Sequence, residues 1–242
     1  MADYLTLERQ TAGALGFDRR PVAVTFAREA PAGVPKFGGT EPAGCSFWRL
    51  AERGAVFYTE PGDHYTCAIG CYTHRIALPV ERAAELDQTL ALMMQLGYIR
   101  SEDLAQIAQL HETPRFVVYA PLGTTPVAPD VVLFAGRPSV IMLLNEAALR
   151  AGVGTQSASL GRPTCMALPA ALERGAVLST GCIGNRIYTG IGDDELYAAV
   201  RGYDLERVAA EAQTIATANV RLAEYHHARR EGLTKDELAR PS

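Results

Sequence analysis

The sequence predicts an α/β protein, with α+β as the alternative, in which helices cover a mixed sheet built from two pseudo-equivalent repeats. Short β-branched runs alternate with stretches of helical periodicity, which is typical of this class. The segment Glu-Arg-Gly-Ala-Val occurs twice, at 52–56 and 173–177. A Gly-Cys turn followed by an arginine also occurs twice, at 70–75 and 181–186.

In the first half, β-branched residues at 21–27 predict a strand, and Gly54 ends a short helix at 45–53. Apolar residues at helical spacing predict a helix over 80–96, which Gly97 ends. The other elements expected here are helices at 3–16 and 101–110 and strands at 55–59 and 115–120.

In the second half, Pro138 opens a helix at its first turn, and Gly152 ends it. The acidic residues Asp193 and Asp194 suggest the start of a further helix. A long last helix follows Asp204. The other elements expected here are strands at 130–135 and 176–178, a helix at 164–174 and a Gly- and Ser-rich loop at 152–161.

The repeats are expected at approximately 17–120 and 121–232 of a single domain, 1–242, whose last residues, 233–242, form a polar tail. Duplicated units usually pack about a pseudo-twofold axis, and each supplies the partner face that the other lacks. We therefore expect both Gly-Cys turns to face a shared cleft.

Composition excludes several classes of partner. The net charge is -4 and the basic residues are scattered, so we expect no nucleic acid. No uncharged apolar run reaches the ~18 residues that a membrane span needs, so we expect no membrane. The N-terminus resembles no signal peptide, which predicts a cytoplasmic protein. A homo-oligomer is left open.

The five cysteines carry the functional hypothesis. In a reducing compartment they are not expected to form structural disulfides. Cys45, Cys67, Cys71 and Cys182 supply four thiolates, which suit an iron–sulfur cluster of the [4Fe-4S] type with a redox or electron-transfer role. Cys165 is a less favoured ligand. Zinc is the alternative metal, although zinc sites usually contain Cys-x-x-Cys pairs and this chain has none.

Arg75 and Arg186 each follow a Gly-Cys turn by four residues. Their positive charges, together with the backbone N–H groups of the turns, could stabilise an anionic cluster as cofactor-binding residues. A redox partner protein or a small molecule would then be the expected partner.

Two further hypotheses stay open. A metal-free thiol-dependent enzyme would use Cys182 or Cys71 as the nucleophile, with His64 or His74 as the base, on a small molecule. The protein could also be non-catalytic and either bind a small molecule or be purely structural. In that case the cysteines would be buried thiols in glycine turns. The sequence does not decide whether the protein is an enzyme.

The order of these motifs resembles the domain-of-unknown-function 169 family (DUF169), the uncharacterised ArCR proteins of bacteria and archaea. The resemblance runs over roughly residues 4–225, and the 181–186 motif is its most specific part. It implies cytoplasmic single-domain proteins with recurrent cysteines and implies no particular activity. The motifs that carry it are Cys45, Cys67-x-x-x-Cys71, Pro121-Leu, Pro129-Asp-Val-Val, Cys165, Gly181-Cys-Ile-Gly-Asn-Arg and Gly192-Asp-Asp-Glu.

Overall fold

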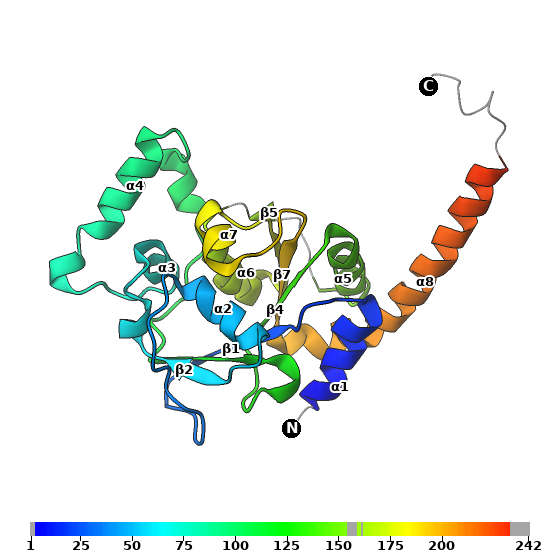
Figure 1. The fold of residues 1–242 in the computed structure, drawn as a ribbon, viewed down its shortest axis with the longest axis horizontal. Coiled ribbons are helices and arrows are strands. Elements are labelled where there is room, and N and C mark those ends of the chain that lie inside the picture. Colours follow the sequence, from blue (N-terminus) through cyan, green and yellow to red (C-terminus); the bar gives the residue numbers. More distant parts are fainter. Residues whose placement is uncertain (1–2, 154–158, 161, 233–242) are drawn as a thin grey trace.

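A seven-stranded sheet forms the centre of the protein, and helices cover both of its faces (Figure 1). The computed structural model describes residues 3–153, 159–160 and 162–232. The strand order is β2-β3-β1-β4-β7-β6-β5, and all neighbours are antiparallel except β5 and β6. The predicted fold class, α/β with a mixed sheet, is confirmed. The strands are β1 Val22–Ala27, β2 Phe57–Thr59, β3 Phe116–Pro121, β4 Val131–Gly136, β5 Ser159–Leu160, β6 Ala176–Ser179 and β7 Leu196–Arg201.

The helices lie between these strands and at both ends of the described chain. A 3-10 turn, η6 (Thr164–Met166), leads directly into α6, and a π-helical turn at Arg9–Gly13 extends α1. The α-helices are α1 Tyr4–Glu8, α2 Gly44–Glu52, α3 Ala68–Thr73, α4 Glu85–Gln95, α5 Pro138–Arg150, α6 Ala167–Arg174, α7 Ile183–Thr189 and α8 Leu205–Glu231.

Strand side chains alternate between two cores, one on each face of the sheet. Val22 and Val24 face a core that α2 and α6 complete, with Phe47, Trp48 and Leu168. The intervening residues of the strands face a second core, which α5 and the first half of α8 complete. The face with α2 and α6 carries the candidate site.

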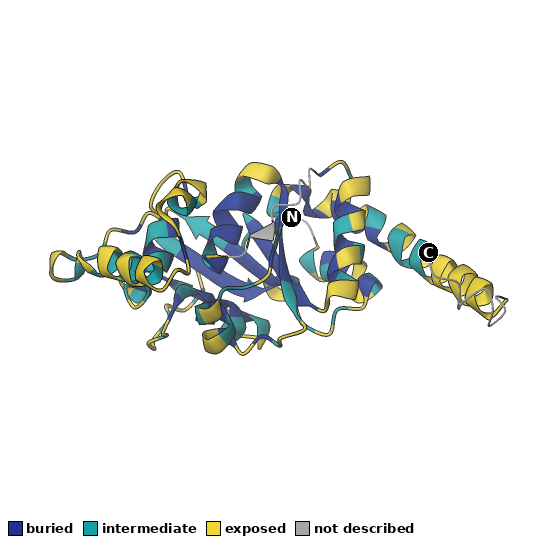
Figure 2. Ribbon diagram, turned by 90° about the horizontal axis from the view of Figure 1, so that it is seen from above, coloured by how far each residue is buried: buried dark blue, intermediate teal, exposed yellow. Residues whose placement is uncertain are grey.

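Two parts of the chain project from this body (Figure 1). One is the arm, residues 77–112, which contains α4; the other is the second half of α8. Figure 2 shows that both are largely exposed, whereas the sheet between them is buried. Within the arm, no residue of α4 is buried. The stripe that the sequence analysis assigned to the helix at 80–96 therefore covers no core.

The strand order places β1 beside β4 at the centre, with β3 and β2 outside β1 and with β7 and β6 outside β4. This arrangement fits the predicted repeat but does not establish a duplication, which stays a prediction.

The prediction that a helix starts near Asp193 is wrong. Residues 192–195 form a turn that leads into β7, and Glu195 accepts a hydrogen bond from the Gly192 N–H at 2.7 Å and two from Arg19 at 2.6 Å. Glu195 therefore holds the turn and an ion pair, and the acidic residues open no helix.

Most of the predicted 152–161 loop and the polar tail lie outside the described residues. None of the helices in the described part of the chain combines the length and the apolarity that crossing a bilayer requires.

Gly202, directly after β7, gives a test of this sheet. Its N–H donates to the Asp130 carbonyl at 2.7 Å, and a Cβ at this position would lie 1.8 Å from the Pro129 carbonyl oxygen. We expect Gly202→Ala to lower the free energy of unfolding by about 1–3 kcal/mol, because the backbone must shift to relieve the clash. Gly13→Ala, where a Cβ meets nothing within 4 Å, is the control and should not destabilise. Urea unfolding measures both, and equal stability of the two variants would contradict the close approach.

Candidate functional site

An open cleft of 1180 Å³ lies between the body and the arm. Its body side is formed by the N-terminal part of α2, by α3, by η6 and by the start of α7. These segments contact one another: α2 contacts both α7 and η6, and α3 contacts η6 and α4. Four of the five cysteines line the cleft, one from each segment: Cys45, Cys67, Cys165 and Cys182.

Local structure explains how each of these thiols reaches the cleft. Cys45 is the second residue of α2, whose apolar face is anchored in the core. Cys67 is the N-cap of α3, and its sulfur accepts a hydrogen bond from the Gly70 N–H at 3.3 Å. Cys182 precedes α7, and its N–H donates to the hydroxyl of Thr164, the residue before Cys165. This hydrogen bond holds the segment of Cys182 beside the segment of Cys165.

Cys71 lies apart from this group. It is buried within α3, its Sγ donates to the His64 carbonyl at 3.1 Å, and it lines a smaller neighbouring groove of 320 Å³ that shares Arg75 with the cleft. Of the four ligands that the sequence predicted, the structure brings Cys45, Cys67 and Cys182 to one cleft. It adds Cys165 to them and does not bring Cys71.

The thiols interact electrostatically. Burial is the main cause that raises the pKa of Cys45 to about 12; the Asn185 amide lowers it, and Cys67 and Cys182 raise it. Burial also raises the pKa of Cys67 and of Cys165, and each is raised further by other thiols of the group. The thiols are therefore close enough that ionising one opposes ionisation of the next. Without a compensating positive charge, Cys45, Cys67 and Cys165 are neutral at pH 7.

All five cysteines are free thiols. Within residues 3–153, 159–160 and 162–232, no group of three or more His, Cys, Asp or Glu side chains lies close enough together to hold a metal ion as it stands.

Asn185, on α7, is a site residue that the sequence analysis missed. It lines the cleft, is 2% exposed, and lies near the thiol of Cys45 and the hydroxyl of Tyr197, whose pKa values it lowers. Neither its amide nitrogen nor its amide oxygen has a hydrogen-bond partner within the described residues. The only signal in the sequence was its place in the repeated motif, where it aligns with His74.

The two predicted cofactor-binding arginines differ. Arg186 donates to the carbonyls of Thr180 at 2.5 Å, Gly192 at 2.8 Å and Glu195 at 3.1 Å, so it braces the loops around α7. It is not among the residues that line the cleft. Arg75 does line the cleft and donates to the His111 carbonyl at 3.3 Å.

His64 and His74, the bases considered for a thiol enzyme, are both buried and do not line the cleft. Burial lowers the pKa of His64 to about 3 and that of His74 to about 4. His64 instead bonds the Thr59 hydroxyl at 2.8 Å, and His74 bonds Thr73 at 3.0 Å. These contacts and pKa values are typical of neutral structural histidines.

The fold and the cleft define an α/β protein with a thiol-lined site between its body and a projecting arm. A family model described as uncharacterised ArCR matches residues 12–211. The chain therefore belongs to the DUF169 family, as its motifs predicted. It is similar to the uncharacterized protein MJ0308 of Methanocaldococcus jannaschii, with 29% identity over 197 residues, which is 75% of this chain and 82% of that protein. No solved structure matches.

Replacing Asn185 tests whether its amide has a structural role. We expect Asn185→Leu, of similar size, to leave the free energy of unfolding of the metal-free protein unchanged or to raise it by up to about 1 kcal/mol, because no buried hydrogen bond is lost. Thr189→Val, on the same helix, is the control. It removes the 2.8 Å bond from the Thr189 hydroxyl to the backbone carbonyl of Asn185 and the contacts of that hydroxyl with the Tyr197 hydroxyl and the Ile191 N–H, and should cost about 1–3 kcal/mol. Urea unfolding in the presence of a reductant measures both, and a larger loss for Asn185→Leu than for Thr189→Val would show that the amide is structurally paired.

Proposed function

We propose that the cleft binds an iron–sulfur cluster of the [4Fe-4S] type through Cys45, Cys67, Cys165 and Cys182, and that the protein has a redox or electron-transfer role. The observation that carries the proposal is that these four thiols, from four separate segments, line one cleft. Four cysteine thiolates are the usual ligands of such clusters, and thiolates are soft donors that prefer iron–sulfur and other soft centres.

The electrostatics support this proposal. The thiols of Cys45, Cys67 and Cys165 resist losing their protons, because burial raises their pKa values and neighbouring thiols raise them further. Bound iron would supply the positive charge that favours the thiolate forms. A bound cluster would supply one-electron chemistry, while the chain holds it and sets its surroundings. Loading would have to draw the four sulfur atoms around a common centre.

Hydrogen bonds to sulfur adjust the reduction potential of a cluster. The Gly70 N–H already donates to the Cys67 sulfur at 3.3 Å. Asn185 lies beside Cys45 with an amide nitrogen that has no partner in the described part of the chain. Both groups are placed to donate to ligand sulfur, so we assign them a tuning role.

The proposed ligand set differs from the sequence-based set in one residue. Cys165 takes the place of Cys71, because Cys165 lines the cleft whereas Cys71 is buried in α3 with its thiol bonded to the His64 carbonyl. Zinc remains the alternative metal for the same four thiols.

The metal-free thiol enzyme has less support. A nucleophilic cysteine needs a lowered pKa and a nearby base. The pKa values of Cys45, Cys67, Cys71 and Cys165 are raised, and the two buried histidines lie outside the cleft. Alkylation at low pH that is selective for Cys182 would favour this alternative.

Single Cys→Ser variants test the ligand set. After anaerobic reconstitution with iron and sulfide, the native chain should hold about four of each per molecule, as a [4Fe-4S] cluster does. Replacing any of Cys45, Cys67, Cys165 or Cys182 should remove most of this iron. Cys71→Ser is the matched control and should retain it, because a serine hydroxyl can still donate to His64. Iron and sulfide analysis with electron paramagnetic resonance measures the outcome.

Three results would count against the proposal. A native chain that stays free of iron and sulfide would exclude the cluster. Binding of zinc alone would support the other metal. Loss of iron from Cys71→Ser with retention in Cys165→Ser would restore the set predicted from the sequence.

A further inference from the structure

The cleft is larger than a site for four thiols alone requires. Its volume of 1180 Å³ exceeds the range of about 300–1,000 Å³ that is typical of pockets for small organic ligands. Much of its wall comes from the arm, which contributes no cysteine. The arm therefore encloses space for a second ligand beside the thiols.

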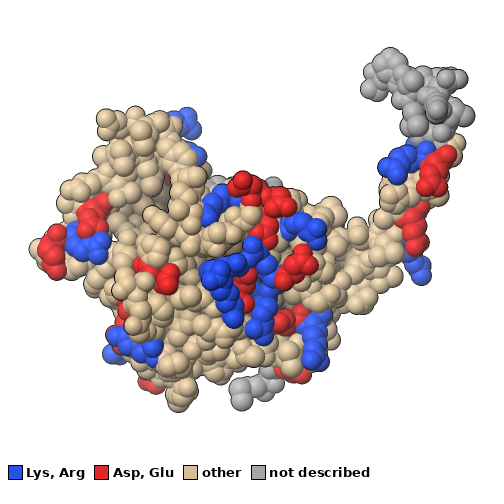
Figure 3. All heavy atoms as spheres, viewed as in Figure 1, with Lys and Arg blue, Asp and Glu red and all other residues tan. Residues whose placement is uncertain are grey.

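The arm offers this space an apolar surface. Leu90 and Met93 of α4, and Ile99 and Ile107 beyond it, line the cleft. No residue of α4 is buried in a core, so its apolar stripe is only partly covered in the described chain, by the contact with α3. In the view of Figure 3, the charged side chains of the arm gather at its two ends, and the surface between them is uncharged. Apolar walls with a few polar groups are typical of sites for organic molecules.

Arg75 adds a positive charge to the same cleft. Among the described residues, it is the one non-glycine residue with a positive φ, 54°, and it follows the C-cap of α3, where glycine is the usual residue. Arg75 has no carboxylate partner among the described residues. Its single side-chain hydrogen bond goes to the His111 carbonyl. Arg162, also in the wall, is by contrast paired with Asp103 at 3.3 Å and stacked on Tyr98 at 4.7 Å.

We propose that the cleft contains a second binding site, beside the thiols, for a small organic anion with an apolar body. Arg75 binds its carboxylate, sulfonate or phosphate group, and the apolar face of the arm covers the rest. A guanidinium suits this role because it donates two parallel hydrogen bonds to a planar or tetrahedral anion. The site needs no cluster, so it goes beyond the proposed function and can be tested without iron.

Two fluorescent probes of similar shape test the charge and the apolar wall separately. Anilinonaphthalene sulfonate is an apolar anion, and N-phenylnaphthylamine is its neutral analogue. We expect the metal-free full-length chain to bind the anionic probe at one saturable site, from which decanoate displaces it. Arg75→Gly should weaken binding of the anionic probe about tenfold or more, because a charge-assisted hydrogen bond is lost, and should leave binding of the neutral probe unchanged.

Arg75→Gly is chosen because glycine tolerates the positive φ, so the variant should fold at least as stably as the native chain. Arg115→Gln, an exposed arginine that does not line the cleft, is the control and should bind both probes as the native chain does. Met93→Ser should weaken both probes, since it removes part of the apolar wall.

Absence of saturable binding, or equal affinity of Arg75→Gly and the native chain for the anionic probe, would overturn the inference. The outcome is separable from that of the cluster. A Cys182→Ser chain that holds no iron should still bind the anionic probe in an Arg75-dependent way. A chain that holds a cluster but fails the probe test would retain the proposed function and lose this one.

Discussion

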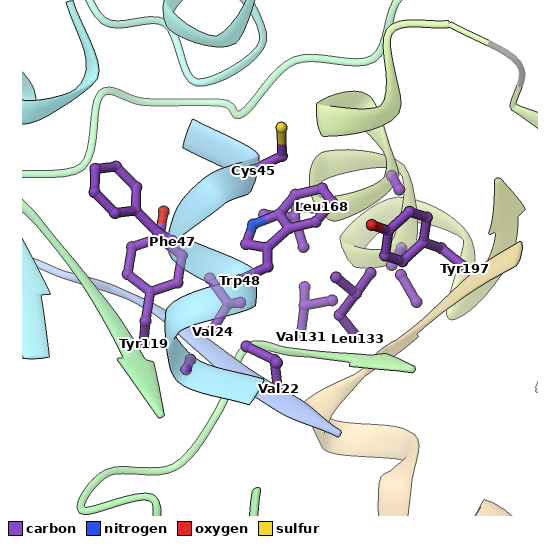
Figure 4. Close-up of a cluster of buried hydrophobic side chains, with 14 of the residues drawn as sticks. Val22, Val24, Cys45, Phe47, Trp48, Tyr119, Val131, Leu133, Leu168 and Tyr197 are labelled. Atoms are coloured by element: carbon purple, nitrogen blue, oxygen red, sulfur yellow. The ribbon is translucent and has the colours of Figure 1, made fainter. Parts of the chain in front are cut away.

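The packing of α2 against the sheet is the interaction on which the candidate site depends. Phe47 is completely buried, its ring centroid lies 5.4 Å from that of Tyr119, and Trp48 is nearly as buried. Figure 4 shows these rings on the sheet. Cys45 lies at the start of the same helix, and its thiol points away from the rings. Because α2 cannot shift without exposing these rings, Cys45 is fixed at the rim of the core. The helix α6 packs on the same face and fixes the turn that carries Cys165 in the same way. The apolar core thus holds thiols from both halves of the chain within electrostatic reach of one another.

The segments that bring thiols to the cleft contain buried polar atoms without hydrogen-bond partners, which lowers the stability of the fold. Buried polar atoms nearly always find hydrogen-bond partners. In the described chain, the exceptions include the Ser46 hydroxyl next to Cys45, the Asn185 amide and the Nε2 of His74. All three lie in the segments that bring thiols to the cleft. Unsatisfied polar groups and thiols are thus concentrated in one place, where stability alone would favour apolar side chains, and this concentration is what the proposed ligand site would explain.

Much of the fold could be predicted from the sequence, because local signals agreed with the tertiary structure. The β-branched run at 21–27 matches β1, Val22–Ala27, within one residue. By contrast, β7 was missed because two alanines, Ala198 and Ala199, interrupt its strand-forming residues and because it follows acidic residues that suggest a helix start. The contacts that accompany the strand conformation are distant in sequence: β7 pairs with β4 and β6, and Glu195 pairs with Arg19. Similarly, periodicity revealed the apolar stripe of α4 but not what it faces, since a stripe that lines a cleft has the same pattern as one that packs on a core. The choice between Cys71 and Cys165 also depended on tertiary contacts.

The two arginines of the repeated motif show how similar sequences can take different roles. Arg186 bonds three backbone carbonyls and precedes by four residues a glycine, Gly190, that adopts the left-handed conformation at the end of α7. At the end of α3 the arginine itself occupies the left-handed position, which is unfavourable for a residue with a Cβ. The Arg75 side chain makes one hydrogen bond, to the His111 carbonyl. The left-handed conformation of Arg75 ends α3: the Arg75 N–H donates to the Tyr72 carbonyl at 3.2 Å and the Ile76 N–H donates to the Cys71 carbonyl at 2.9 Å, as in a Schellman motif. The proposed anion site rests instead on the Arg75 side chain, which lines the cleft and has no carboxylate partner in the described chain. The half that contributes Cys45, Cys67 and the arm would then also supply the charge that selects what binds beside the thiols, while the other half supplies ligands and bracing.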